Sequence, residues 1–369
     1  LPISPGGGVS LGAFSDHRHY EEDAIYWRMP NGGDTDHWFW DKLSVSGPDP
    51  VSVSYPFDLQ HVAPEGLDGE VRLMLYGYTT GDHRIQLYLN DVPLLAEPVQ
   101  TWSGREEKLY QVPVSQTLFV EGANELRVES ILPPALAISE FYVNWFEVTY
   151  QDTFVAEDDR LLFSVSAPGD HTFEVTDFST QALALFDITD PASPIQILNA
   201  AIEPTAGTYR LRFNDDTTNG RTYLAQAMGQ LPRPNLQRDE PSTWKSTNNG
   251  ATYIIITHPN FYEVSETLAN YRTDQGETVV TVKTEDIYDE FNDGIYGPHA
   301  IRKFLEYAYV NWSPKPIYVL LIGNGTVDPK HNIGGGAPDF VPAYHVDTPL
   351  FGQAPNDSWY AKVNGADDY

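Results

Sequence analysis

Three short apolar runs in the last third of the chain constrain its fold more than any other feature. They read ATYIIIT at 251–257, TVVTVKT at 278–284 and IYVLLIG at 317–323. Between them, apolar residues recur at helical spacing over 261–274 and again after Pro298, a residue type that favours the first turn of a helix. Strands this apolar, alternating with helices, predict a parallel α/β sheet covered on both faces.

The first two thirds of the sequence have the pattern of an all-β protein. Apolar and polar residues alternate in short runs between turn residues, and the predicted strands are 51–59, 70–79, 84–95, 106–114, 124–131 and 140–150. A second set follows at 161–165, 171–175, 182–187, 195–199, 208–213 and 222–227. Asn90-Asp91, between two apolar runs, predicts a hairpin turn.

These patterns predict a multidomain chain. Residues 1–150 form a β-sandwich or jelly roll of galactose-binding-like type, and residues 151–228 form a small β domain. The proline-rich, aperiodic stretch 229–250 is a linker. Residues 251–369 are expected to form an α/β domain with a Rossmann-like parallel sheet.

Charge and composition exclude several classes of function. The chain has 52 acidic and 22 basic residues and a net charge of −30, which disfavours nucleic-acid binding. It has no apolar run long enough to span a bilayer. With no cysteine, these 369 residues hold no thiol nucleophile. The Leu1 start is interpreted as processed, with any export signal removed, which predicts an extracellular or cell-surface protein.

The carboxyl ends of the predicted parallel strands are where a site is expected. Gly323-Asn324-Gly325 follows the third run, yet neither the helix of a dinucleotide site nor the lysine of a P-loop comes after it. No nucleotide cofactor is therefore predicted. Calcium suits loops rich in oxygen ligands, and the candidate ligands are Asp328, Asp357, Asp367 and Asp368.

Other polar groups were weighed against ordinary structural roles. Asp215, Asp216 and Asn219 have ligand-like spacing, but a solvated turn is favoured; Asp286, Asp289, Glu290 and Asp293 are interpreted as a solvated acidic turn. His17 and His19 are interpreted as exposed loop histidines rather than metal ligands, since no third ligand is evident. No GxSxG-like elbow supports a triad drawn from His258, His299, His331 and His345.

Tryptophans of the first domain have two interpretations. Burial in the sandwich core is favoured, because Trp and Tyr dominate β cores. The alternative is a carbohydrate-binding platform built from Trp38, Trp40 and Trp102.

Several longer segments of the last third resemble the gingipain-type cysteine peptidase family. They are ATYIIITHPNF, LANYRTDQGETVVTVKTEDIYDEFNDGIYGPHAIRKFLEYAYVNW, IYVLLIGNGTVDP, VPAY and NDSWYAKVNGADDY. The resemblance implies that residues 251–369 are the first half of a gingipain-like peptidase domain with a caspase-like α/β fold, in which a His–Cys pair cleaves peptide bonds. In the family both residues lie downstream of the ADDY region, so no residue of this chain inherits a catalytic role.

The resemblance predicts the non-catalytic N-terminal portion of an exported gingipain-like endopeptidase. The expected partner is the remainder of that peptidase or a neighbouring subunit, with protein or glycan ligands at the surface as further candidates. A surface or filament-forming protein without proteolysis and a carbohydrate-binding module are the alternatives. If the peptidase interpretation is right, the sheet near 317–324 has an apolar edge that is either contacted by another polypeptide or bare.

Overall fold

The computed structural model describes residues 8–30, 36–96, 100–236 and 238–364. The chain divides into two compact units. The first, here called the β unit, comprises Leu1–Glu22 and Phe39–Asn235. The second, the α/β unit, comprises Leu236–Tyr369 together with Asp23–Trp38, a segment from the first tenth of the sequence. The predicted 1–150 domain therefore contains a segment that folds with the α/β part.

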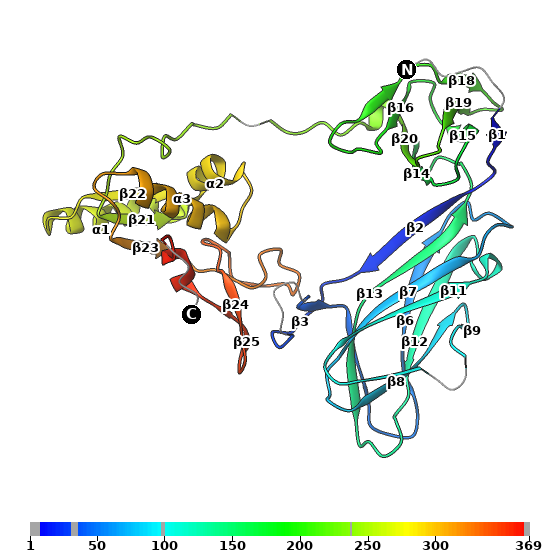
Figure 1. Cartoon of the computed structure of the whole chain (residues 1–369), viewed down its shortest axis with the longest axis horizontal. Coiled ribbons are helices and arrows are strands. Elements are labelled where there is room, and N and C mark those ends of the chain that lie inside the picture. Colours follow the sequence, from blue (N-terminus) through cyan, green and yellow to red (C-terminus); the bar gives the residue numbers. More distant parts are fainter. Residues whose placement is uncertain (1–7, 31–35, 97–99, 237, 365–369) are drawn as a thin grey trace. The chain divides into compact units, whose positions relative to one another are not determined.

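Two antiparallel sheets form a sandwich in the β unit (Figure 1). One has the order β11-β7-β13-β2, with β5 also on β13, and the other has the order β10-β8-β12-β6, with β9 on β8. The strands are β2 (Phe14–Glu21), β5 (Asp41–Val45), β6 (Val51–Leu59), β7 (Gly69–Gly77), β8 (Asp82–Leu89), β9 (Val92–Pro93), β10 (Gln100–Ser103), β11 (Glu107–Val114), β12 (Gly122–Ser130) and β13 (Ser139–Asp152). A short 3-10 helix, η1, spans Gln116–Leu118.

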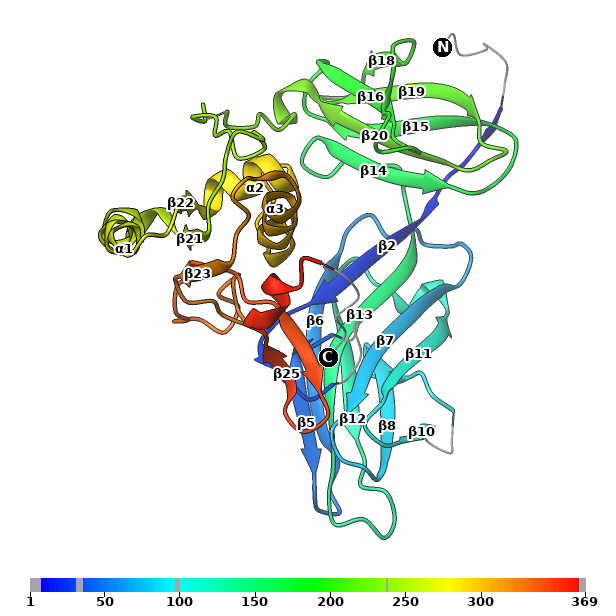
Figure 2. The same ribbon diagram turned by 60° about the vertical axis from the view of Figure 1, so that its left-hand side comes forward.

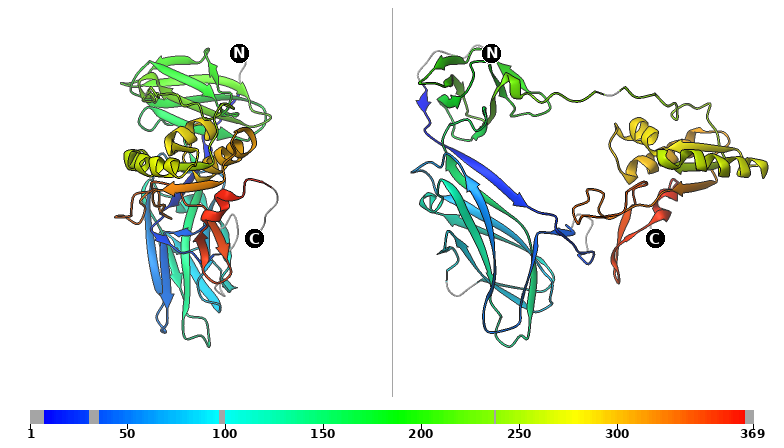
Figure 3. Two further views of the ribbon diagram at one scale, coloured as in Figure 1. Left: turned by 90° about the vertical axis from the view of Figure 1, so that its left-hand side faces the viewer. Right: turned by 180° about the vertical axis from the view of Figure 1, so that it is seen from behind.

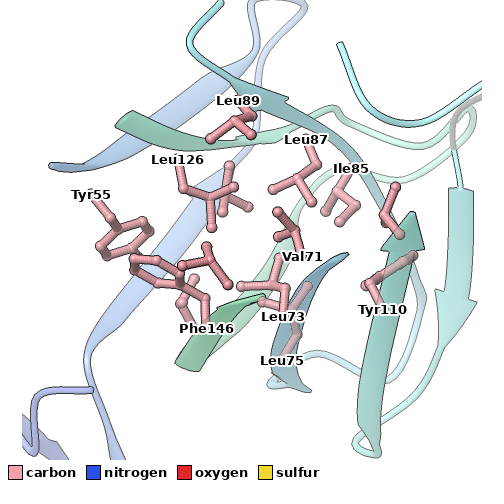
Figure 4. Packing of buried hydrophobic residues seen from close by; sticks show 14 of the residues in the cluster. Tyr55, Val71, Leu73, Leu75, Ile85, Leu87, Leu89, Tyr110, Leu126 and Phe146 are labelled. Atoms are coloured by element: carbon pink, nitrogen blue, oxygen red, sulfur yellow. The ribbon is translucent and has the colours of Figure 1, made fainter. Parts of the chain in front are cut away.

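Side chains that alternate along each strand fill the space between the sheets (Figure 4). On β7 the alternate residues Val71, Leu73 and Leu75 are fully buried. On β8 the alternate residues Ile85, Leu87 and Leu89 are fully buried as well. This period of two is the pattern that predicted the strands. The hairpin at Asn90-Asp91 is confirmed, since both residues have positive φ, 51° and 66°, as a type I′ turn requires.

A second, smaller pair of sheets completes the β unit. Their orders are β1-β15-β19-β18 and β14-β20-β16-β17. The strands are β1 (Val9–Ser10), β14 (Arg160–Val165), β15 (Asp170–Phe178), β16 (Leu183–Asp187), β17 (Ile195–Ile197), β18 (Ala201–Pro204), β19 (Tyr209–Asp216) and β20 (Arg221–Ala227), with the 3-10 helix η2 at Met228–Gln230. Strand β2 runs out of the sandwich toward this domain (Figure 3), and its Phe14 belongs to the smaller core.

The α/β unit is built on the parallel sheet β22-β21-β23, as predicted. Its elements are β21 (Tyr253–Thr257), η3 (Pro259–Phe261), α1 (Tyr262–Asp274), β22 (Val279–Lys283), α2 (Thr284–Asn292), α3 (Pro298–Asn311) and β23 (Tyr318–Ile322). Helix α1 lies on one side of the sheet and α2 and α3 lie on the other (Figure 2). Ile254 and Ile256 of β21 pack in one core with Phe304 and Leu305 of α3.

Helix α2 corrects one expectation. Asp286, Asp289 and Glu290 lie on this helix and not in a solvated turn, and Asp293 is its left-handed C-terminal residue, with φ 54°. The helix is stabilised because Ile287 and Tyr288 are buried in the core that α2 shares with α3. In the sequence, the carboxylates around these two residues mask the short apolar stripe.

Two short pairs of strands complete the α/β unit. Strands β24 (His345–Thr348) and β25 (Gly352–Pro355) form a hairpin, followed by the 3-10 helix η4 (Asp357–Ala361). Strands β3 (Ile25–Tyr26) and β4 (Trp38–Phe39) pair with each other. Asp23–Trp38 is referred to below as the strap.

Candidate functional site

The carboxyl edge of the parallel sheet is the expected position of a site, and the structure shows a segment folded across it. The backbone N–H groups of Phe340 and Val341 donate to the carbonyl of Asn324 at 2.9 and 3.2 Å. A Cβ on Gly323 would lie 2.8 Å from that of Phe340, so only glycine permits this approach. The ring of Phe340 also packs against His258 at 4.9 Å and Phe261 at 4.7 Å.

Polar groups around this edge are engaged within the fold. Nδ1 of His258 accepts from the backbone N–H of Asn260 at 3.2 Å. Tyr296 donates to a carboxylate oxygen of Asp339, whose other oxygen accepts from the N–H of Thr326 at 3.3 Å. Sequence reasoning missed Asp339, because its role depends on a loop that returns to the strand ends.

The four histidines of the α/β part do not converge on a hydroxyl nucleophile. His299 packs against the rings of Trp359 and Tyr344, at 5.1 and 5.8 Å. His345 is half-buried, and burial, with the nearby His37 of the strap, lowers its pKa. His331 is exposed, with φ 60°. Their surroundings differ, and the geometry contains no triad among these described residues.

Of the four predicted calcium ligands, the structure describes Asp328 and Asp357. Asp328 is 4% exposed, and its two carboxylate oxygens accept from the N–H groups of Asn332 and Ile333 at 2.8 and 2.9 Å. Asp357 is exposed in the first turn of η4, while Asp367 and Asp368 lie outside the described residues. Within the described ranges no group of three His, Asp or Glu side chains is arranged to hold a metal. Calcium binding stays a prediction.

The second ligand-like loop has the geometry of a self-capped turn. One carboxylate oxygen of Asp216 accepts from both the N–H and the hydroxyl of Thr218, at 2.9 and 2.5 Å. Asp215 accepts from the hydroxyl of Tyr223 at 2.7 Å. These hydrogen bonds lower the pKa of Asp216.

His17 and His19 lie on strand β2 and not in a loop, which corrects the sequence interpretation. Their side chains share the outer face with Glu147, whose Oε1 lies 3.4 Å from Nε2 of His17 and 3.1 Å from Nδ1 of His19. Burial opposes charging of His19, but hydrogen bonds to Glu21 and Glu147 outweigh it and raise the pKa. Arg72 donates to the other oxygen of Glu147 at 2.5 Å.

The three tryptophans proposed for a carbohydrate platform have different surroundings. Trp102 is 9% exposed and lies in the sandwich core, with its ring 4.7 Å from that of His83. Trp40 packs on the same core against Tyr55 at 4.6 Å. Trp38 lies in the strap, in the other unit, against Tyr26. Trp40 and Trp102 thus follow the core interpretation.

Strand β23 has the apolar edge that the sequence predicted. In the part of the chain that the structure describes, β23 pairs only with β21. Tyr318 and Val319 are 54% and 40% exposed, and Ile317, just before the strand, is 69% exposed. Tyr253, Arg272, Glu277, Tyr318 and Val319 line a groove of about 370 Å³ beside α1. The beginning of this edge and the adjoining part of the sheet face are therefore exposed, while Leu320, Leu321 and Ile322 are half-buried.

Comparison with known proteins agrees with this architecture. Residues 246–369 match peptidase family C25. The resemblance of this part to the gingipain family is confirmed. No curated protein matches the chain. No helix in the described residues is both long and apolar enough to cross a membrane.

The chain shares its multidomain fold with dimeric latent PorU from Porphyromonas gingivalis, a crystal structure. The TM-score is 0.67 at 13% identity, over 98% of this chain and 35% of PorU. The chain therefore spans about a third of the length of that protein. The carbohydrate-binding module CBM36, in complex with calcium and xylotriose, aligns with 36% of this chain and 98% of its own at 14% identity, with a TM-score of only 0.22.

Proposed function

We propose that this chain is the non-catalytic, N-terminal part of an exported gingipain-like cysteine endopeptidase. The match of residues 246–369 to peptidase family C25 and the fold shared with PorU support this assignment. The thiol that such a peptidase needs has to come from other polypeptide, because these 369 residues include no cysteine.

The observation that carries the proposal is the bare edge of β23. A parallel strand with unpaired backbone groups and exposed Tyr318 and Val319 is a template for a further strand. A segment that paired with β23 and crossed over the groove beside α1 would bury both. In this proposal that segment belongs to the remainder of the peptidase region, which brings the His–Cys pair.

The test compares this chain with a longer product of the same gene. We expect the 369-residue chain alone not to hydrolyse an unfolded protein substrate, and the product extended beyond Tyr369 to do so. Val319→Lys, which places a charge on the β23 edge, should reduce the activity of the longer product. Val310→Lys, at a 66% exposed position of α3, is the matched control and should leave it unchanged.

Two results would overturn the proposal: thiol-independent hydrolysis that copurifies with the 369-residue chain, or a gene that encodes no His and Cys after Tyr369. The second result would favour a surface or filament-forming protein, since a bare strand edge equally accepts another copy of the chain. That alternative predicts self-association that Val319→Lys abolishes, measured by light scattering.

A further inference from the structure

A cavity of about 470 Å³ lies in the β unit where strands β2, β13 and β14 meet. Two apolar cores lie on either side of it along the β2–β13 ribbon. Tyr150 belongs to the sandwich core, and Phe14 to the core of the small domain. Between these cores the inward-facing positions are Asp16 and Arg18 on β2 and Asp152 at the end of β13. Polar residues thus interrupt an otherwise apolar stripe.

The hydrogen bonds of this polar layer are too few for its carboxylates. Arg18 donates from Nε to Asp16 at 2.6 Å and from NH2 to Glu157 at 3.3 Å. The hydroxyl of Tyr150 lies 3.2 Å from Asp16 and 3.3 Å from Oδ2 of Asp152. A hydroxyl has one hydrogen, so Tyr150 serves only one of these two carboxylates at a time.

The carboxylate of Asp152 is the one that lacks a hydrogen-bond donor, among the described residues, for one of its oxygens. It is 1% exposed, and its Oδ1 has no hydrogen-bond partner among the residues that the structure describes. Buried polar atoms in folded proteins almost always have a partner, and an unpaired buried carboxylate is costly. Asp152 is one of the residues that line the cavity, so a donor bound there is the means by which a group from outside the chain would satisfy this carboxylate.

The charges around the cavity favour a cationic ligand. Its lining includes four carboxylates, of Asp16, Asp152, Glu157 and Asp158, against two guanidinium groups, of Arg18 and Arg160. Even with both arginines counted, these carboxylates leave one negative charge without a counter-ion while Asp152 is protonated, and two above its pKa of about 8. His17, which also lines the cavity, adds charge only when it is protonated.

We propose that this cavity binds an organic cation, a guanidinium or primary ammonium group on an aliphatic stem, which donates to Oδ1 of Asp152. Phe14 and Leu161, 5% and 6% exposed, and Leu162 at 43% provide an apolar wall for the stem. A metal ion fits less well, because the described residues include no group of three His, Asp or Glu side chains placed to coordinate one. The ligand is either a free small molecule or a basic side chain of a polypeptide.

The test uses agmatine as the free guanidinium and a Gly-Arg-Gly peptide as the polypeptide source. Binding to the intact chain is measured by calorimetry in low-salt buffer, above the pKa of Asp152. We expect at least one probe to bind, and Asp152→Asn to weaken its binding at least about tenfold, because truncating one charge of a buried pair usually costs more than that. Asp91→Asn, at a carboxylate with 89% exposure that pairs with Arg127, should change binding less than about twofold.

Asparagine has nearly the shape of aspartate and carries no charge, so Asp152→Asn should fold, and its melting curve checks this. Binding of agmatine identifies a free ligand as sufficient; binding of the peptide alone assigns the site to a polypeptide. The proposal is overturned if neither probe binds, or if Asp152→Asn binds as the parent chain does. It is also overturned if calcium chloride, tested in parallel, binds in an Asp152-dependent way while both organic cations fail.

Discussion

The hydroxyl of Tyr26 donates a hydrogen bond of 2.7 Å to Oε1 of Gln353, a residue 327 positions further along the chain. The N–H of Gln353 in turn donates to the carbonyl of Arg28 at 2.7 Å, and Nδ2 of Asn332 donates to Asp23 at 2.9 Å. The strap is thereby an integral part of the α/β unit. A segment that lies between the sandwich strands β2 and β5 in sequence completes a region matched to the C25 family.

A substitution at Gly352 tests how much the strap contributes to the stability of the α/β unit. A Cβ at Gly352 would lie 1.8 Å from the carbonyl oxygen of Arg28, and its φ of 65° is itself unfavourable for alanine. We expect Gly352→Ala to destabilise the α/β unit by about 2 kcal/mol or more, and to increase amide hydrogen exchange within the strap. Gly335→Ala is the matched control, since Gly335 has φ 62° but nothing within 4 Å of its Cβ position. Equal effects of the two substitutions would show that backbone strain alone is responsible.

The linker 229–250 has three basic residues, Arg233, Arg238 and Lys245. Pro234 protects the bond after Arg233 from trypsin, so trypsin should cleave after Arg238 and spare Lys245. Arg238 is exposed, whereas the backbone of Lys245 is hydrogen-bonded to both α2 and α3. The N–H of Lys245 donates to Glu290 of α2 at 2.8 Å, and its carbonyl accepts from Tyr307 of α3. The predicted linker 229–250 is thus docked over its second half, where Trp244 also packs against Trp312. Early cleavage after Lys245 would contradict this prediction.

After that cleavage the two fragments should remain associated. The strap is carried by the N-terminal fragment but belongs to the fold of the C-terminal one. We expect gel filtration of the nicked protein to give a single peak containing both fragments, and Tyr26→Phe combined with Gly352→Ala to promote their separation. Spontaneous separation of the parent fragments would mean that the strap contributes little.

Asp152 predicts an unusual dependence of stability on pH. Burial and the charge of Asp16 raise its pKa from 3.8 to about 8, although the backbone N–H of Thr153 lowers the pKa by hydrogen bonding; Glu157 raises it further and Arg18 lowers it. Because the folded state then holds a proton that the unfolded state has lost, the contribution of Asp152 to stability falls as pH rises from about 4 to about 8. One pKa unit corresponds to about 1.4 kcal/mol, so we expect a loss on the order of 2 kcal/mol or more across this window.

Asp152→Asn should remove that part of the pH dependence and leave a protein more stable at pH 8 than the parent chain. The measurement is denaturant unfolding at a series of pH values. A parent chain whose stability rises across the same window, with no difference from Asp152→Asn, would show that the carboxyl is ionised at ordinary pH in the folded state.

Calcium binding is tested by the melting temperature with calcium and with chelator. If calcium binds the α/β unit through Asp328 or Asp357, the ion stabilises the fold by mass action, and chelator should lower the transition. Asp357→Asn should abolish the difference if this exposed carboxylate is a ligand. Asp328→Asn replaces one of two buried acceptor oxygens with an NH2 group and should lower stability with or without calcium, so only a calcium-dependent part of its effect supports the ion.

Elements whose signals are local could be predicted from the sequence by itself. Helix α3 runs from Pro298 to Asn311, as the proline at its first turn and its apolar spacing indicate. Strand β6, Val51–Leu59, has its predicted bounds, because a period of two extends over its whole length. The parallel sheet followed from three apolar runs, and the lack of a thiol from composition. Helix α2 was missed because its carboxylates mask a short apolar stripe.

The strap and the cavity could be recognised only from the tertiary structure. No local pattern indicates that Tyr26 lies beside Gln353, because a hydrogen bond between distant segments depends on how the whole chain folds. Asp152 did carry a signal: it continues the inward-facing series of Phe146, Val148 and Tyr150 at a period of two. What surrounds that carboxyl, a cavity shared with Asp16 and Glu157, comes from strands more than a hundred residues apart. Asp152 is buried, and its Oδ1 lacks a partner in the described part of the chain, only because of that packing.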